Sequence, residues 1–253
     1  MQLDAGRVAK SDKPILAGLY LSKFDSLGLK QLGFDSFTEA FNVLGYAVGS
    51  PPSSIKNYRD EFDPLFLNPR KGWHKRPRRD NCLRVLEEYK NLDFELFTGL
   101  IKSFASYDEN VWSEVEPEEA LGEGESHFAK RLITGLAAEK YFELNHHKLL
   151  EFQGCSVENT TKLGCGYDFR LQAKPSDDFL AVEVKGLKGR VGSLSLTPKE
   201  HAVAAGLGGR FFLFVVKNFQ EEPFHEIFQN PLSGLHFRRN ARKIVQISWL
   251  VNV

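Results

Sequence analysis

The sequence is poor in cysteine and contains no long uncharged apolar run. Its three cysteines are odd in number and form no CxxC pair, which argues against a disulfide framework and against a zinc ribbon. No apolar stretch is long enough to span a bilayer, and the first residues lack the apolar core of a signal peptide. We therefore expect a cytoplasmic protein without a membrane segment.

The sequence also lacks a net charge, because 33 Lys and Arg residues balance 33 Asp and Glu residues. This balance argues against a general binder of polyanions, but the charges are unevenly distributed along the chain. Residues 70–79 (RKGWHKRPRR) are densely basic, and residues 109–125 (ENVWSEVEPEEALGEGE) are densely acidic. The basic run indicates a nucleic-acid surface or, alternatively, a solvated loop. The acidic stretch, centred on residues 117–124, indicates a linker between two domains, residues 1–115 and 116–253.

The first domain is predicted to be helical. Residues 36–44 have a helical pattern, residues 45–52 form a break rich in glycine and proline, and residues 53–62 begin a second helix with a serine available as N-cap. Helix, break and helix is the layout of a helix-turn-helix motif, although this break is longer than usual. Two packed helices without a DNA-binding role are the alternative. The predicted DNA-binding side chains here, chosen because Asn suits adenine, Arg suits guanine and Lys suits phosphate, are Lys56, Asn57, Arg59, Arg70, Lys71, Trp73, Lys75 and Arg76.

The second domain is predicted to mix helices and strands. The expected order is a helix over residues 126–145, a strand over 149–157, two hairpin strands within 166–186, a helix over 197–206, a buried strand over 211–216 and a further strand-like run at 244–251. Thr197 and Glu200 have the spacing of a capping box, with proline at the first helical position. A strand before this helix and a buried strand after it predict a right-handed crossover between parallel strands.

The hairpin, residues 166–186 (GYDFRLQAKPSDDFLAVEVKG), contains the candidate reactive site. Pairing its two strands so that their apolar residues share one face sets Phe169 opposite Val182. The same register sets Asp168 opposite Glu183 on the other face. Facing carboxylates destabilise a sheet unless a cation lies between them.

A divalent metal ion bound by the two carboxylates would supply that cation, with the ammonium of Lys185 close by. The alternative is an amphipathic edge hairpin whose charged face is exposed to solvent. The loop after the hairpin is basic and rich in glycine, so Lys188 and Arg190 are predicted to approach a phosphate backbone.

Glu139 is a further candidate residue for this site. In the helix that contains it, the apolar residues Phe128, Leu132, Leu136 and Phe142 are predicted to form one stripe, with Glu139 near its middle. A carboxylate that faces a core is costly unless it is paired or bound to a metal ion. The alternative is a Glu that reaches solvent or a buried basic residue.

This order, a helix with Glu139, then Asp168, then Glu183-Val184-Lys185, resembles the PD-(D/E)xK nuclease superfamily. The local sequence GYDF, FLAVEVKG, LTPKEHAVA and RFFLFVV is similar to its restriction-endonuclease-like branch, over about residues 125–231. Tyr167 replaces the proline of the superfamily's name.

The resemblance implies an α+β or α/β architecture, with a helical, helix-turn-helix-like DNA-recognition domain and an αβββαβ nuclease core with a mixed sheet. It implies that Asp168, Glu183 and the carbonyl of Val184 hold one or two Mg²⁺ ions, with Mn²⁺ able to substitute. Lys185 would orient or deprotonate the attacking water, and Glu139 would act on the metal directly or through water.

The expected function is therefore a Mg²⁺-dependent endonuclease that cleaves double-stranded DNA, as a sequence-specific type II restriction enzyme. Cutting both strands of a palindromic duplex favours a homodimer. Two alternatives stay open: a DNA-binding module with an inactive nuclease-like scaffold, and a defence nuclease that acts on modified DNA or on RNA.

Overall fold

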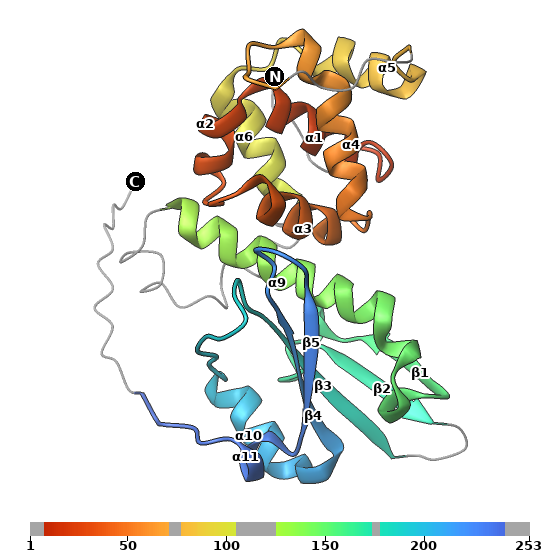
Figure 1. The fold of residues 1–253 in the computed structure, drawn as a ribbon. Helices are drawn as coiled ribbons and strands as arrows, with labels where there is room; N and C mark the ends of the chain where they lie inside the picture. The colour runs from red at the N-terminus through yellow and green to blue at the C-terminus, as the bar shows by residue number, and fades with distance from the viewer. Residues whose placement is uncertain (1–7, 71–76, 105–124, 174–177, 241–253) are drawn as a thin grey trace, which may run out of the picture.

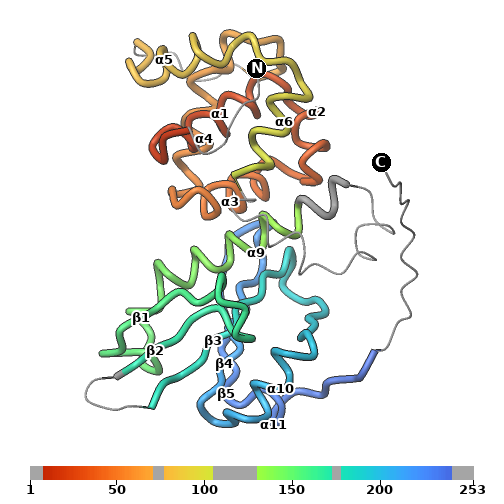
Figure 2. Tube along the Cα trace, turned by 180° about the vertical axis from the view of Figure 1, so that it is seen from behind, coloured from red at the N-terminus to blue at the C-terminus, as the bar shows by residue number. Residues whose placement is uncertain are grey.

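The computed structural model describes residues 8–70, 77–104, 125–173 and 178–240, with only the backbone described for residues 125–129 and for Ala173. A long helix, α9 (Glu125–Asn145), runs through the middle of the molecule (Figure 1). A group of helices lies on one side of α9 and a β-sheet lies on the other, and Figure 2 shows the same arrangement from behind. This α+β architecture confirms the predicted fold class.

The N-terminal region contains six described helices and a short 3₁₀ turn. They are α1 (Lys13–Lys23), α2 (Asp25–Gln31), α3 (Phe37–Ala47), α4 (Pro52–Phe62), the turn η2 (Asp63–Leu65), α5 (Asp80–Tyr89) and α6 (Phe94–Ser103). Helix α1 is buried on all sides, as expected of a helix with apolar residues around its whole circumference. Helix α3 begins after Ser36, whose hydroxyl accepts the Glu39 N–H. The predicted serine cap of α4 is wrong, because the helix begins at Pro52, whose fixed φ suits a first turn.

In the described part of the C-terminal region, five strands and two α-helices follow α9. They are β1 (Cys155–Asn159), β2 (Phe169–Ala173), β3 (Phe179–Gly186), α10 (Pro198–Leu207), β4 (Phe211–Lys217), β5 (Phe224–Gln229) and α11 (Pro231–Gly234). The strands lie in the order β1-β2-β3-β4-β5, and the pairing of β3 with β4 is parallel whereas the other pairings are antiparallel. Helix α10 supplies the crossover that a parallel pair requires.

The predicted register of the hairpin is confirmed. Phe169 pairs with Val182 and Leu171 with Leu180. These apolar residues are part of the main core together with Phe142 of α9, whose ring centroid lies 4.7 Å from that of Phe169. The core sits between α9 and the sheet, so the register is fixed by the burial of one face of the hairpin.

Two predictions of strands need correction. Within the predicted strand at 149–157, residues 150–152 form a 3₁₀ turn, η4 (Leu150–Phe152), and the strand begins only after Gly154, which has a positive φ of 77°. Strand β5 was not predicted. Its residues are all partly or fully exposed, so buried and exposed positions do not alternate along it. The strand-like run at 244–251 and the acidic stretch that contains the predicted domain boundary lie outside the described residues.

The two regions share one cluster of buried apolar side chains. Polar contacts add to it: the side-chain amide of Asn42 donates to the carbonyls of Phe219 and Glu221, at 2.8 and 2.7 Å. Lys130 of α9 forms a 2.8 Å ion pair with Glu39 of α3, whose side chain is almost fully buried. The helical region is therefore docked firmly on α9 and on the turn between β4 and β5. None of the described helices meets the length and hydropathy that a membrane span requires.

Candidate functional site

The backbone of β2 and β3 holds Asp168 in place. Gly166 has a φ of 87°, and a Cβ there would lie 2.9 Å from Val203, so the turn before Asp168 requires glycine. The N–H of Asp168 donates to the carbonyl of Val182 at 3.0 Å, which extends the hairpin register by one residue. Its Oδ2 accepts the N–H of Val184 at 2.8 Å. The carboxylate is thus fixed over β3.

Glu183 and Lys185 project from the same face of β3, as residues two apart in a strand must. The Lys185 Nζ lies 2.6 Å from Glu183 Oε1, and Glu183 is only 3 % exposed. Asp168 faces Glu183 across the hairpin, as predicted. The alternative of an exposed edge hairpin is therefore wrong.

Glu200 of α10 also belongs to this cluster. Its carboxylate contacts the Lys185 Nζ at 3.1 and 3.2 Å and accepts the Thr197 N–H at 2.9 Å. The capping box is confirmed, and the same glutamate both caps α10 and holds the lysine. The sequence indicated the cap but gave no sign of the second contact, which depends on where α10 packs.

Glu139 faces this cluster from α9, but the predicted stripe around it is wrong in part. The buried face of α9 is formed instead by Ile133, Ala137, Ala138, Tyr141 and Phe142. Leu132 and Leu136 lie on a different face and line an open cleft together with Glu139. Phe142 is core as predicted, and the side chain of Phe128 lies outside the described residues.

The carboxylates of the cluster outnumber its ammonium groups, since Glu139, Asp168, Glu183 and Glu200 lie around Lys185, with Lys140 acting on Glu139 alone among these acids. Burial, together with Glu139, raises the pKa of Asp168 to about 8, against the effects of the Val184 N–H and Lys185. Burial raises the pKa of Glu139 to about 7 against the effect of Lys140, with Glu183 adding to the rise. Burial and Asp168 also raise the pKa of Glu183. Burial lowers the pKa of Lys185, but the adjacent Glu183 and Glu200 outweigh it, so its pKa rises overall.

Within the described part of the chain, no group of three His, Cys, Asp or Glu side chains has the geometry of a preformed metal site. Mg²⁺ does not need one, because it binds through one or two carboxylates and completes its octahedron with water and phosphate oxygens. The facing pair Asp168 and Glu183 fits that requirement. The excess negative charge, shown by the raised pKa values, is what a divalent cation would neutralise.

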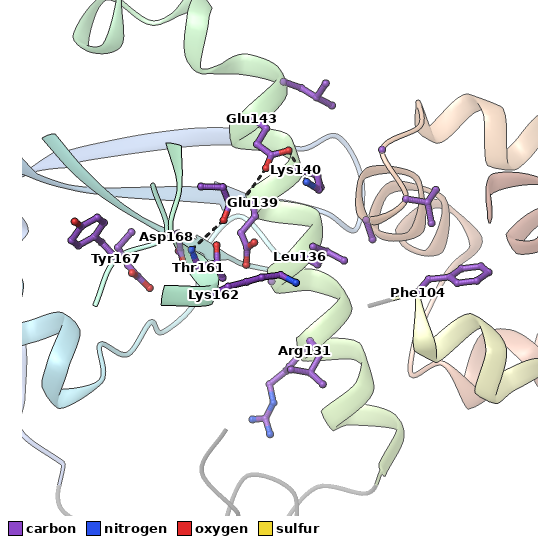
Figure 3. A pocket seen from close by; sticks show the side chains of 18 of the residues that line it. Phe104, Arg131, Leu136, Glu139, Lys140, Glu143, Thr161, Lys162, Tyr167 and Asp168 are labelled. Carbon is purple, nitrogen blue, oxygen red and sulfur yellow. Dashed lines mark hydrogen bonds and ion pairs between the residues drawn. The ribbon is translucent and has the colours of Figure 1, made fainter. Parts of the chain in front are cut away.

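A cleft of about 1090 Å³ opens from this cluster toward the helical region. Helix α9 forms its floor, and Figure 3 shows Tyr167 and Asp168 on one side of that helix and Phe104 on the other. Its cationic lining residues are Lys10, Lys13, Arg131, Lys140, Lys162 and Lys199. None of these was predicted, because they come from separate elements and form no run in the sequence.

The predicted DNA-binding residues of α4 are only partly on the surface. Lys56 and Asn57 are exposed, as expected. Arg59 is not: it is 8 % exposed, pairs with Asp60 at 2.5 Å and lies over the ring of Phe41. The prediction that Arg59 is exposed for base contacts is wrong, because an i,i+2 spacing from the exposed Asn57 turns it toward the helical core.

Arg70 is likewise engaged within the protein, since its guanidinium binds both Asp63 and Asp25. Lys188 and Arg190 are exposed and form ion pairs with Asp35 and Glu221. These positions do not line the cleft. The other predicted residues of the basic run, Lys71, Trp73, Lys75 and Arg76, lie outside the described residues.

Part of the chain matches a known family. Residues 138–229, from α9 to the end of β5, match a family described as "Protein NO VEIN, C-terminal". The matched segment contains Glu139, Asp168, Glu183, Lys185 and Glu200, so the whole cluster lies within the region that is similar to this family. Neither the curated proteins nor the solved structures contain a match to the chain.

Proposed function

We propose that the protein is a Mg²⁺-dependent DNA endonuclease of the PD-(D/E)xK type. The observation that carries this proposal is the facing of Asp168 and Glu183 across the β2–β3 hairpin, with Lys185 2.6 Å from Glu183. The parallel β3–β4 pair, crossed over by α10, and the preceding α9 match the αβββαβ order that the resemblance implies. Sequence-specific cleavage of a duplex by a homodimer is the narrower form of this proposal.

The chemistry is assigned to four side chains. Asp168 and Glu183 would hold the metal ion, with the Val184 carbonyl as a further ligand. Mg²⁺, when bound, would neutralise charge on the phosphate oxygens and activate water. Lys185 stays protonated because of its raised pKa, so it serves as a fixed positive charge beside the scissile phosphate rather than as a base. Glu200 positions that ammonium from α10.

Glu139 lies within α9, close enough to Asp168 and Glu183 for the three carboxylates to raise one another's pKa. Its pKa, raised to about 7, allows it to exchange a proton near neutral pH. We assign Glu139 the role of contacting a water molecule that would complete the metal coordination. This assignment explains why a carboxylate occupies a partly buried position beside two others.

The test is cleavage of plasmid DNA by the purified full chain with Mg²⁺. Asp168→Asn and Lys185→Met are expected to lower the cleavage rate by at least about a hundredfold. Asn keeps an oxygen for the Val184 N–H, so the hairpin is preserved. The matched control is Glu158→Gln, which removes an exposed carboxylate of the same sheet and should cut at the unchanged rate.

Equal cleavage by the control and by both site variants would refute the assigned site. Binding of DNA without cleavage in any divalent ion would favour the alternative of an inactive nuclease-like scaffold.

A further inference from the structure

We propose that the cleft over α9 binds an unpaired DNA strand, so that the scissile strand reaches the carboxylates only when it is not base-paired. This inference deepens the proposed function, because it names the form of the substrate that the same site accepts. It rests on the shape, the lining and the depth of the cleft.

The floor of the cleft is a face of α9 on which leucines alternate with charged side chains. Leu132 and Leu136 of α9 are partly exposed there, and Leu144 is 50 % exposed. The opposite face of the same helix is already buried against α3 and β3. A helix that leaves leucines uncovered beside a charged catalytic cluster is suited to a ligand with both apolar and charged parts.

One aromatic side chain borders the carboxylate end of this floor. Tyr167 is partly exposed and precedes the metal-binding Asp168, whereas Phe104 at the other end is only 4 % exposed and lies under the Lys13 ammonium (Figure 3). Nucleic-acid bases stack on aromatic rings irrespective of sequence, but only when they are not paired in a duplex. The leucines of the floor and the Tyr167 ring therefore match the bases of a single strand.

Exposed cations border the leucines of the floor and match the phosphates of such a strand, while Lys140 neutralises Glu143 of the same lining at 2.7 Å. Lys10 comes from the helical region, Arg131 from α9, Lys162 from the turn before β2, and Lys199 from the first turn of α10. They lie on elements on both sides of the cleft. A strand that crosses the cleft would meet positive charge along its path rather than at one point.

The depth and the volume of the cleft favour one strand over two. Glu183, at the end of the cleft, is only 3 % exposed, so a phosphate must enter the cleft to reach it. The volume of about 1090 Å³ holds a ligand of a few nucleotides, since sites for drug-sized ligands span about 300–1,000 Å³. A duplex keeps its bases stacked inside and cannot present them to the floor.

Gly135 allows the cleft to be blocked without disturbing the core. It lies in α9 between Leu132 and Leu136, and a Cβ added there would meet no atom within 4 Å. Gly135→Trp therefore places an indole in the cleft, and tryptophan is a better helix former than glycine. Gly99 of α6 is the matched control, because it is an exposed helical glycine with the same open surroundings and does not line the cleft.

The experiment measures binding by fluorescence anisotropy with a labelled single strand of about 12 nucleotides, a typical site size for single-strand binders. A blunt duplex of the same sequence is the comparison, and Ca²⁺ replaces Mg²⁺ so that the substrate stays intact. The wild-type protein should bind the single strand at least about tenfold more tightly than the duplex. Gly135→Trp should lose at least that factor for the single strand, whereas Gly99→Trp should bind as the wild type does. Unchanged thermal unfolding of Gly135→Trp shows that the fold is intact.

Tighter binding of the duplex, or unchanged single-strand binding by Gly135→Trp, would overturn the inference. Cleavage with Mg²⁺ separates this failure from failure of the proposed function. If Gly135→Trp still cuts a duplex and Asp168→Asn does not, the inference fails and the nuclease assignment stands. If the single strand binds in a manner sensitive to Gly135→Trp but no DNA is cut, the cleft assignment stands and the proposed function fails.

Discussion

Both regions of the molecule bury ionised side chains, but they balance the charges differently. In the helical region, the Asp63 side chain is fully buried and binds Arg70 at 2.8 Å, with Arg59 at 3.7 Å. The Ser22 hydroxyl donates to the same carboxylate at 2.8 Å. Each charge there has a partner of opposite sign, so the network needs no ligand.

In the sheet region, Asp168, Glu183 and Glu139 crowd together, and the adjacent ammonium is that of Lys185, which Glu200 also shares. Burial and this crowding raise the pKa values of the three acids, whereas Arg79 lowers the pKa of the buried Glu61 in the helical region against the effect of burial. Buried charge that is paired stabilises a fold at best, while buried charge of one sign in excess indicates a functional site. The difference between the two regions can be tested residue by residue.

The largest effect on stability is expected in the balanced region. Asp63→Asn leaves the guanidinium groups of Arg59 and Arg70 without their shared carboxylate, and should lower the free energy of unfolding by about 3–5 kcal/mol. Urea denaturation measures this loss. Glu87→Gln breaks an exposed ion pair with Lys90 and should cost less than about 1 kcal/mol. Equal losses in the two variants would show that the buried network has no special role.

A smaller effect, on activity rather than on stability, is expected at Glu200. Gln at this position can still accept the Thr197 N–H and cap α10, but it removes one of the two charges that hold Lys185. Glu200→Gln should lower kcat for DNA cleavage by about 10–100-fold, as is typical of groups that orient a catalytic residue. KM and the thermal unfolding temperature should change little. A rate equal to that of the wild type would limit Glu200 to its capping role.

The smallest effect is expected on the stability of the metal-free protein, and its sign is opposite to that at Asp63. The pKa of Asp168 is about 8 in the folded protein and near 3.8 when unfolded, so the folded state binds more protons between these values. Stability should therefore fall as the pH rises from about 4 to about 8. Asp168→Asn removes this penalty and should stabilise the EDTA-treated protein at pH 8 by roughly 1–2 kcal/mol. Near pH 4 the wild type and Asp168→Asn should have the same free energy of unfolding.

If Asp168→Asn is instead less stable than the wild type at pH 8, the charge of Asp168 is balanced by its surroundings, as that of Asp63 is in the helical region.

The hairpin site was predictable from the sequence because its geometry is local. Alternating apolar residues fix the register, and the register alone places Asp168 opposite Glu183. The same argument located Lys185 on the face of Glu183. The crossover helix and the strand after it were predictable from the capping box and from the continuous apolar run of β4.

The parts that depend on tertiary packing were not predictable. Arg59 and Arg70 have the composition of a DNA-binding surface, but Asp63 and the rings beneath them hold both inside. Helix α9 packs against α3 and β3 and also lines the cleft, so apolar residues occur around most of its circumference and no single stripe could be assigned. The second contact of Glu200 and the cations of the cleft likewise arise from elements that are distant in the sequence.

The central claim is that the surplus carboxylates of the hairpin form a site for a divalent metal ion. Thermal unfolding of the EDTA-treated protein, titrated with Mg²⁺ at pH 8, tests it most directly, because an ion that binds only the folded state raises the unfolding temperature. The account predicts a saturable rise for the wild type and for Glu87→Gln, and none for Asp168→Asn. An equal rise in all three proteins, or no rise in the wild type, would contradict it.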